Sequence, residues 1–167
     1  ADGVSTFIGD LADNTGLGDA TAQADVIIHC ASNPRNFERV DVEGTQNLLQ
    51  AINKERTKHF IYISIVGVDR SDYPYYKAKL AVEKMIAGSS IPFTILRTTQ
   101  FHSFVLSIAQ TLIAEQQNGI VTIPPTMRFQ SIAIREVAQK LVDLVEQAAG
   151  LLPEFGGPEF LFFEEMV

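Results

Sequence analysis

Short apolar runs alternate with amphipathic helical patterns through the first hundred residues of the chain. The runs that read as strands are residues 4–8, 26–30, 60–65 and 93–96. The second and third runs are apolar almost throughout, as expected for strands buried on both faces of a parallel sheet. Strands that alternate with helices in this way predict an α/β fold built from right-handed crossovers.

Two amphipathic helices are expected between these strands. Residues 41–54 place Val42, Leu48 and Ile52 on one side. Residues 75–87 place apolar side chains at i, i+3, i+4, i+7 and i+8, and Gly88 follows as a helix end. The stripe at this spacing indicates a helix that packs one face against a core.

The pattern changes after Arg97. An apolar face beginning at Phe101 predicts a long helix that closes at Asn118, followed by short strands at 120–123 and 129–134 around Pro124-Pro125. Residues 135–148 predict another helix, residues 150–159 a loop, and residues 160–166 a final strand that runs into a helix. We therefore expect a nucleotide-binding region at 1–98 and a small substrate-side extension at 99–167.

Composition excludes several classes of function. The net charge is −7, and no basic patch offsets it, so nucleic-acid binding is disfavoured. Cys30 is the single cysteine, which fits a reducing, cytoplasmic location, and its apolar surroundings favour an inert buried thiol. The scattered histidines show no metal-ligand spacing, and no apolar run reaches the roughly 20 residues of a membrane span. The expected partner is a small molecule; a homodimer is compatible with the sequence.

Two tyrosines precede a lysine by four positions in residues 72–84: Tyr73 with Lys77, and Tyr75 with Lys79. On a helix, such residues lie on one face, about 5–6 Å apart. A nearby ammonium favours the tyrosinate, so the phenol can exchange a proton with a substrate carbonyl or alcohol. Spacing alone does not choose between the pairs, and the double match shows that it also occurs by chance.

Polar residues lie where the predicted strands end. Ser64 is near the end of one strand, and Thr98 and Thr99 follow the next. Parallel sheets bind ligands at the carboxyl ends of their strands, so these groups are expected to converge on one crevice.

Several blocks of the chain resemble the atypical short-chain dehydrogenase/reductases, nearest to the NmrA-like NAD(P)H-binding branch. They are "GDLAD", "ADVIIHCAS", "DVEGTQNLL", "HFIYISIVGVD", "PYYKAKLAVEK" and "FTILRTTQFHSF", in the right order and at fitting intervals. The resemblance implies a Rossmann-like doubly wound parallel sheet and NADP or NAD as cofactor. It also aligns Tyr75 and Lys79, rather than Tyr73 and Lys77, with the family's catalytic pair.

The same alignment implies a set of cofactor contacts and a doubtful third catalytic group. Lys79 is expected to touch the nicotinamide ribose, and Ser64 lies next to the position of the family's catalytic serine. The other expected cofactor-binding residues are Asp10, Leu11, Cys30, Ala31, Ser32, Thr98, Thr99, Gln100 and Phe101. For each, the plainer alternative is a polar or packing residue at a strand end.

Three departures from the family pattern bear on function. Ile65 occupies the usual serine position, and neighbouring Ser64 should face the opposite side of its strand. Asp41 stands where many extended members have Asn. The glycine-rich phosphate loop is absent, since "GLGDAT" at 16–21 reads as a loop entering a helix. The chain is therefore expected to lack the first two strands of the family's sheet.

The leading interpretation is an NAD(P)-dependent oxidoreductase of the atypical short-chain type, acting on a small carbonyl compound or quinone. Tyr75 would be the general acid/base and Lys79 its partner. The alternatives are an NmrA-like regulator that senses the dinucleotide without catalysis, and a truncated fragment without function. Ile65 in the serine position favours the regulator.

If these 167 residues were the whole polypeptide, we expect weak dinucleotide binding or none, because the phosphate loop is missing. Isothermal titration with NADPH and NADH measures this, and micromolar affinity of the isolated 167-residue chain would refute it.

Overall fold

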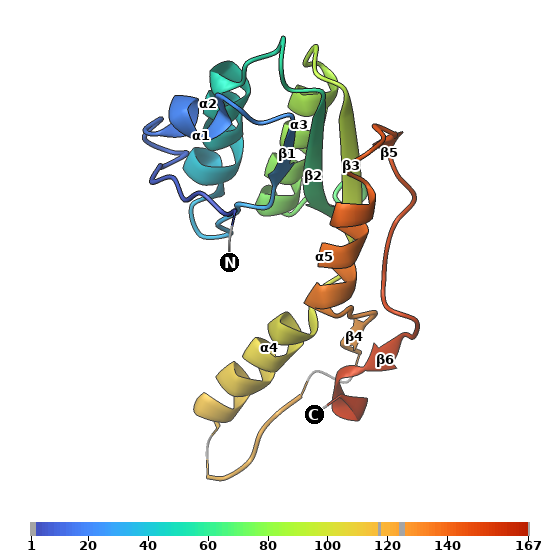
Figure 1. The fold of residues 1–167 in the computed structure, drawn as a ribbon. Coiled ribbons are helices and arrows are strands. Elements are labelled where there is room, and N and C mark those ends of the chain that lie inside the picture. Colours follow the sequence, from blue (N-terminus) through green and yellow to red (C-terminus); the bar gives the residue numbers. More distant parts are fainter. Residues whose placement is uncertain (1–2, 117, 124–125, 167) are drawn as a thin grey trace.

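A parallel β-sheet forms the centre of the molecule in the computed structural model, which describes residues 3–116, 118–123 and 126–166 (Figure 1). Its strands are β1 (Val26–His29), β2 (His59–Ile65), β3 (Phe93–Thr98) and β5 (Gly150–Leu151), in the order β1-β2-β3-β5. Every pairing between these neighbours is parallel. The predicted α/β class is confirmed.

Helices cover both faces of the sheet (Figure 1). The α-helices of the described chain are α1 (Leu17–Thr21), α2 (Gly44–Ala51), α3 (Pro74–Ala87), α4 (His102–Ala114) and α5 (Ile134–Asp143), of which α4 lies beyond the end of the sheet (Figure 1). A π-helical segment, η1 (Glu38–Glu43), runs directly into α2. Pro74 opens α3 at a position where the missing N–H costs nothing, and Gly88 caps its end, as the sequence indicated.

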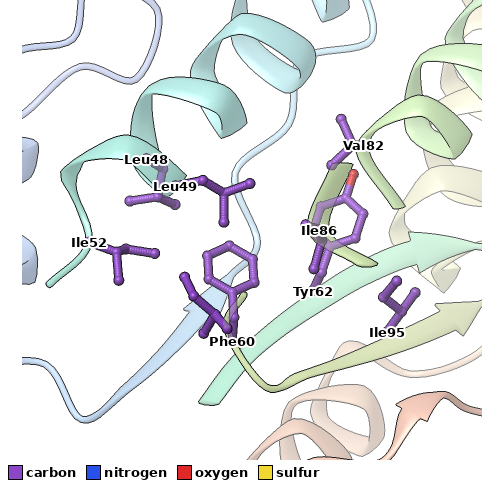
Figure 2. Close-up of a cluster of buried hydrophobic side chains, with 9 residues drawn as sticks. Leu48, Leu49, Ile52, Phe60, Tyr62, Val82, Ile86 and Ile95 are labelled. Carbon is purple, nitrogen blue, oxygen red and sulfur yellow. The ribbon is translucent and has the colours of Figure 1, made fainter. Parts of the chain in front are cut away.

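One face of the sheet packs against α2 and α3 (Figure 2). Phe60 and Tyr62 of β2 project from this face and are almost fully buried. They contact Leu48 and Leu49 of α2 and Val82 of α3, the stripes expected from the helical periodicity. Burying a large apolar side chain of this kind contributes about 2 kcal/mol.

The opposite face of the sheet packs against α5. Ile61 of β2 and Leu96 of β3 point to this side and meet Val137 and Leu141 of α5. Since successive residues of a strand face opposite sides, burial of both Phe60 and Ile61 shows that β2 is covered on both faces. This explains why its sequence is apolar almost throughout.

A smaller unit lies beyond the end of the sheet (Figure 1). The strands β4 (Arg128–Phe129) and β6 (Leu161–Phe162) pair antiparallel and are followed by a short 3-10 helix, η2 (Phe163–Glu165). Phe163 is buried in a third apolar cluster with Val105 and Ala109 of α4. This cluster holds α4 against the short strands.

The structure corrects three predictions about strands. Residues 4–8 are not a strand; Ile8 is 96% exposed, and this segment pairs with no strand of either sheet in the described chain. Gly150–Leu151, predicted as loop, forms β5, because parallel pairing with β3 supplies hydrogen bonds that the sequence pattern does not reveal. Residues 120–123 form no ladder within the described chain, and 129–134 is a strand only at Phe129. Pro124-Pro125 lies outside the described residues.

A buried ion pair joins β3 to α3. The Arg97 guanidinium donates to both carboxylate oxygens of Glu83, at 2.9 and 2.7 Å, and also to Asp69 at 2.7 Å. Both side chains of the Arg97–Glu83 pair are less than a tenth exposed. The bidentate pair raises the pKa of Arg97 further above its ordinary value, with Asp69 adding to the effect.

Replacing Glu83 by Gln is expected to lower the free energy of unfolding by about 3 kcal/mol, because it leaves the buried Arg97 charge without its main partner. Urea denaturation measures the change. The exposed Glu146→Gln variant is the control and should stay within about 0.5 kcal/mol of the parent. Equal stability of the two variants would show that the pair does not hold α3 to the sheet.

Candidate active site

A cavity of about 770 Å³ opens at the carboxyl ends of the parallel strands. Cys30 and Ser32 border it just after β1, Ser64 and Ile65 at the end of β2, and Thr98 at the end of β3. The predicted convergence of polar groups at one edge of the sheet is therefore observed. This edge is where doubly wound proteins bind their ligands.

Aromatic and aliphatic side chains form most of the remaining wall. The start of α3 contributes Tyr73, Tyr75 and Tyr76, and the start of α4 contributes Phe101 and Phe104. On the side of α5 the wall is formed by Ile134, Val137, Ala138 and Leu141. Polar side chains therefore border the cavity near the strand ends, and aromatic and aliphatic side chains make up most of its lining.

Lys79 is buried at the inner end of this cavity, with only 3% of its surface exposed. Its ammonium donates to the carbonyl oxygen of Ile63 at 3.1 Å and lies 3.7 Å from a carboxylate oxygen of Asp41. It also sits 4.3 Å from the centre of the Tyr62 ring. Burial lowers the pKa of Lys79 to about 8, although the carboxylates of Asp41 and Glu83 oppose this. The group is therefore mainly cationic at neutral pH.

Asp41 is the acidic partner of this site, and it is 1% exposed on the π-helical segment η1. One of its oxygens accepts a hydrogen bond from the Ser32 hydroxyl at 2.5 Å. The other accepts from the backbone N–H of Asn33 at 3.0 Å. The carboxylate thus fixes the loop after β1 against η1, next to the Lys79 ammonium.

Tyr75 is half-buried at the start of α3, with its hydroxyl 2.7 Å from the Ser32 hydroxyl. Its ring packs near Phe37 and Tyr76, at centroid distances of 5.9 and 6.4 Å. Burial raises the pKa of the Tyr75 phenol, while its hydrogen bond with Ser32 acts in the opposite direction. Tyr75 and Lys79 border the same cavity and are linked through Ser32 and Asp41.

The other candidate pair, Tyr73 and Lys77, does not come together at the cavity. Tyr73 is 58% exposed, and Lys77 forms a surface ion pair with Asp72 at 2.8 Å. Tyr73 reaches the cavity wall, but Lys77 is not part of that wall. Only Tyr75 and Lys79 both border the cavity, which is the arrangement that the family resemblance implied.

Two hydroxyl groups are buried at the cavity without a hydrogen-bond partner among the described residues: Ser64 Oγ and Thr99 Oγ1. Ser64 is 2% exposed, and β2 continues in regular pairing through Ile65. Buried polar groups without partners are uncommon in folded proteins. Both hydroxyls are therefore candidate contacts for a ligand bound in the cavity.

The other predicted cofactor contacts divide into two groups. Cys30, Ser32, Lys79, Thr98, Thr99, Gln100 and Phe101 border the cavity, and Ala31 lies between two of them without bordering it. Asp10 instead caps its own turn by accepting from the N–H groups of Ala12 and Asp13. Leu11 packs against the core beside α2. The structure thus separates Asp10 and Leu11 from the cavity.

Sequence reasoning did not include Asp41 among the site residues, although it noted Asp41 as a departure. No sequence signal distinguished Asp41, because Glu38 and Glu43 flank it and acidic residues near the start of a helix are usually exposed. The apolar residues of α5 were expected only in a core. They do pack in a core, and the helix also presents part of that stripe to the cavity.

A parallel sheet covered by helices on both faces, with a crevice at the carboxyl ends of its strands, defines the class of Rossmann-like dinucleotide-binding proteins. A family model described as "NAD(P)H-binding" matches residues 1–148 of the chain. The chain therefore belongs to the NAD(P)H-binding family. Its cofactor is NAD or NADP, and the predicted membership of an NAD(P)H-binding family is confirmed.

Relatives and solved structures agree with this assignment. The photosystem II assembly factor Ycf39 of Trieres chinensis is 22% identical over 78% of this chain and 49% of its own. Sterol-4-alpha-carboxylate 3-dehydrogenase ERG26 of Candida albicans is 38% identical over 39% of this chain and 21% of its own. The NADPH complex of the quinone oxidoreductase QOR2 from Escherichia coli has a TM-score of 0.78 at 20% identity, covering 98% of this chain and 57% of its own.

The chain spans between 19% and 49% of the length of the curated relatives it matches. Within the described residues, no helix is long and apolar enough to cross a membrane. The described part of the chain also contains no group of three side chains suited to binding a metal ion. The cytoplasmic location and the homodimer stay predictions.

Acidification is expected to destabilise the protein through His29, the buried last residue of β1. Its Nε2 is 2.9 Å from the Thr45 hydroxyl, and its ring stacks on Tyr62. Burial, together with the Lys79 charge, lowers the pKa of His29 from 6.5 to about 4. Because the folded value is below the unfolded one, this contribution is complete above pH 6.5 and is lost as pH falls through 4.

The expected loss is about 3 kcal/mol, measured by urea denaturation at a series of pH values. A His29→Gln variant should show a flatter dependence of unfolding free energy on pH between 6.5 and 4. An unchanged slope in this variant would assign the acid sensitivity to other groups.

Proposed function

We propose that the protein is an NAD(P)-dependent oxidoreductase that acts on a small carbonyl compound or quinone. The observation that carries the proposal is the shared position of Tyr75 and Lys79 at one cavity, on the carboxyl side of the sheet. A phenol and a buried ammonium beside a dinucleotide crevice are the groups that proton transfer to a carbonyl oxygen requires.

In this proposal Tyr75 is the general acid/base. Its hydroxyl is half-buried and raised in pKa, so at neutral pH it carries the proton that a carbonyl oxygen needs. Lys79, with a pKa of about 8, keeps a positive charge at the cavity that Tyr75 also borders. Asp41 keeps that ammonium in place and limits the depression of its pKa.

The residues at the strand ends fit a dinucleotide. Ser64 and Thr99 offer buried hydroxyls without partners in the described structure, and Thr98 and Gln100 lie beside them. We propose that these groups and Lys79 hold the ribose and amide portions of NAD or NADP. The bound nicotinamide would supply or accept the hydride, a reactivity that belongs to the cofactor.

The aromatic lining of the cavity supports a flat, weakly polar substrate. Tyr73, Tyr76, Phe101 and Phe104 contribute aromatic rings to the lining of the cavity. Aromatic walls favour stacking against another planar ring. The structural neighbour QOR2 is named as a quinone oxidoreductase. We propose that α4, β4, β6 and η2, within the predicted extension at 99–167, form the substrate side of the site.

A second candidate is an NmrA-like sensor that binds the dinucleotide without catalysis. Ile65 supports it, since this residue occupies the position of the family's serine and places an aliphatic side chain at the cavity. Retention of Tyr75 and Lys79 at the same cavity favours the enzyme. The two candidates share a cofactor and differ in turnover.

Substituting Tyr75 by Phe in the full chain is expected to lower kcat/KM for NADPH oxidation by about 100-fold or more, because it removes the proton donor while keeping the ring. The dissociation constant for NADPH should change by less than about twofold. Steady-state assays across quinones and aldehydes, with cofactor titration by fluorescence, measure both quantities.

Tyr73→Phe is the matched control, because it keeps the aromatic ring at the cavity wall and removes only a hydroxyl whose lysine neighbour, Lys77, is on the surface. It should retain the activity of the parent. Full turnover by Tyr75→Phe would remove the proposed acid. Tight cofactor binding by the parent with no turnover on any substrate would instead support the sensor.

A further inference from the structure

Cys30, the single cysteine of the sequence, is exposed and borders the cavity. β1 ends one residue earlier at His29, which is buried against Thr45 of α2 and the ring of Tyr62. Because successive residues of an extended chain face opposite sides, Cys30 turns away from this core. The predicted inert, buried thiol is therefore wrong: the apolar run continues past the last paired residue of β1, to the uncovered edge of the sheet.

Other groups at the same cavity indicate that it holds a ligand. The hydroxyls of Ser64 and Thr99 border it, each side chain is more than nine-tenths buried, and neither hydroxyl has a hydrogen-bond partner in the described chain. Buried polar groups without partners are uncommon, so a bound molecule is a candidate partner for both. The thiol shares this cavity, and a molecule bound there would cover it.

The charge of Lys79 acts on the thiol. Its ammonium favours the thiolate of Cys30, but burial acts in the opposite direction and prevails, so the pKa of Cys30 is raised. Since the thiolate is the nucleophile, a small reagent that meets the thiol only by collision reacts slowly. A reagent that first binds in the cavity is held beside the thiol and reacts faster. The site therefore favours electrophiles that fit the cavity.

We propose that Cys30 is a site of covalent modification by quinones that bind in the cavity, and that bound NAD or NADP shields it. The choice of a quinone rests on the proposed function and on the aromatic rings in the lining, such as Tyr76 and Phe104. The exposure of the thiol at the cavity does not depend on that function. A quinone present without cofactor would then block the cavity in which it otherwise reacts.

The reaction is a conjugate addition, and it needs no outside oxidant or reductant. The Cys30 sulfur forms a bond to a free ring carbon of the quinone, and the carbon–carbon double bond at that position breaks. Its electron pair moves to the carbonyl oxygen, which takes a proton from solvent in place of the one that the thiol releases. The hydrogen on the attacked carbon then moves to the second oxygen through solvent. The product is a hydroquinone thioether, and no group leaves.

Intact-mass spectrometry of the full chain treated with naphthoquinone tests the proposal. The parent should gain the mass of one quinone, and peptide mapping should place the adduct on Cys30. Cys30→Ser, which has no other thiol, should gain none. Dimethylnaphthoquinone, with methyl groups on both ring positions that a thiol attacks, is the matched reagent. It should leave no lasting adduct, and in saturating excess it should slow the addition of naphthoquinone by about tenfold or more.

Protection by the cofactor is measured with NAD⁺ and NADP⁺, because the oxidised forms do not consume the quinone. At about 100 times its dissociation constant, the cofactor leaves only about 1% of the sites free. The rate of adduct formation should then fall by about tenfold or more.

The adduct should also prevent cofactor binding. Treatment with naphthoquinone is expected to raise the dissociation constant of the parent for NADPH by about tenfold or more, measured by fluorescence after the free quinone is removed. In Cys30→Ser the same treatment should change that variant's own dissociation constant by less than about twofold. This comparison of treated with untreated protein separates the adduct from any effect of the substitution.

The outcomes separate the modification site from the proposed function. No adduct on Cys30, while free N-acetylcysteine reacts completely, would overturn the site. An adduct that forms equally fast beside excess dimethylnaphthoquinone would show that the reaction takes place outside the cavity, and would also overturn it; this result decides even in a chain that binds no cofactor. A protected adduct in a parent that turns over no quinone would keep the site and contradict the proposed function.

Discussion

The contact between the Lys79 ammonium and the Asp41 carboxylate is the interaction on which the site depends. Both groups are almost completely buried, and burying either charge alone would cost several kcal/mol. The Ile63 carbonyl and the Tyr62 ring add further stabilisation to the ammonium. The pair therefore ties η1 and α3 to the end of β2. This arrangement places Tyr75 and Ser32 at the same cavity.

The scaffold makes this arrangement rigid because two apolar layers enclose the sheet. Phe60 and Tyr62 hold α2 and α3 on one face, and Ile61 and Leu96 hold α5 on the other (Figure 2). The carboxyl ends of the strands remain uncovered, so the polar residues gather there. A catalytic group on such elements keeps its position better than one on a long loop.

Sequence reasoning located the central strands and α3 because these elements are buried and their periodicity is strong. It failed at residues 4–8 and at Gly150–Leu151, where the presence of a strand depends on a neighbouring edge rather than on local sequence. It placed Tyr75 and Lys79 through the family resemblance. The hydrogen bonds that join Ser32, Asp41 and Tyr75 could not be predicted, because they link residues far apart in the chain whose side-chain directions depend on packing.

The proposed chemistry requires that a nicotinamide ring lie next to the Tyr75 phenol. Nuclear Overhauser contacts between bound NADP or NAD and protein labelled only at tyrosine test this directly in the full chain. We predict cross-peaks from the nicotinamide protons to the Tyr75 ring, identified by their absence in the Tyr75→Phe protein. Nicotinamide contacts to no tyrosine, with the cofactor bound, would contradict the assignment of this cavity as an active site.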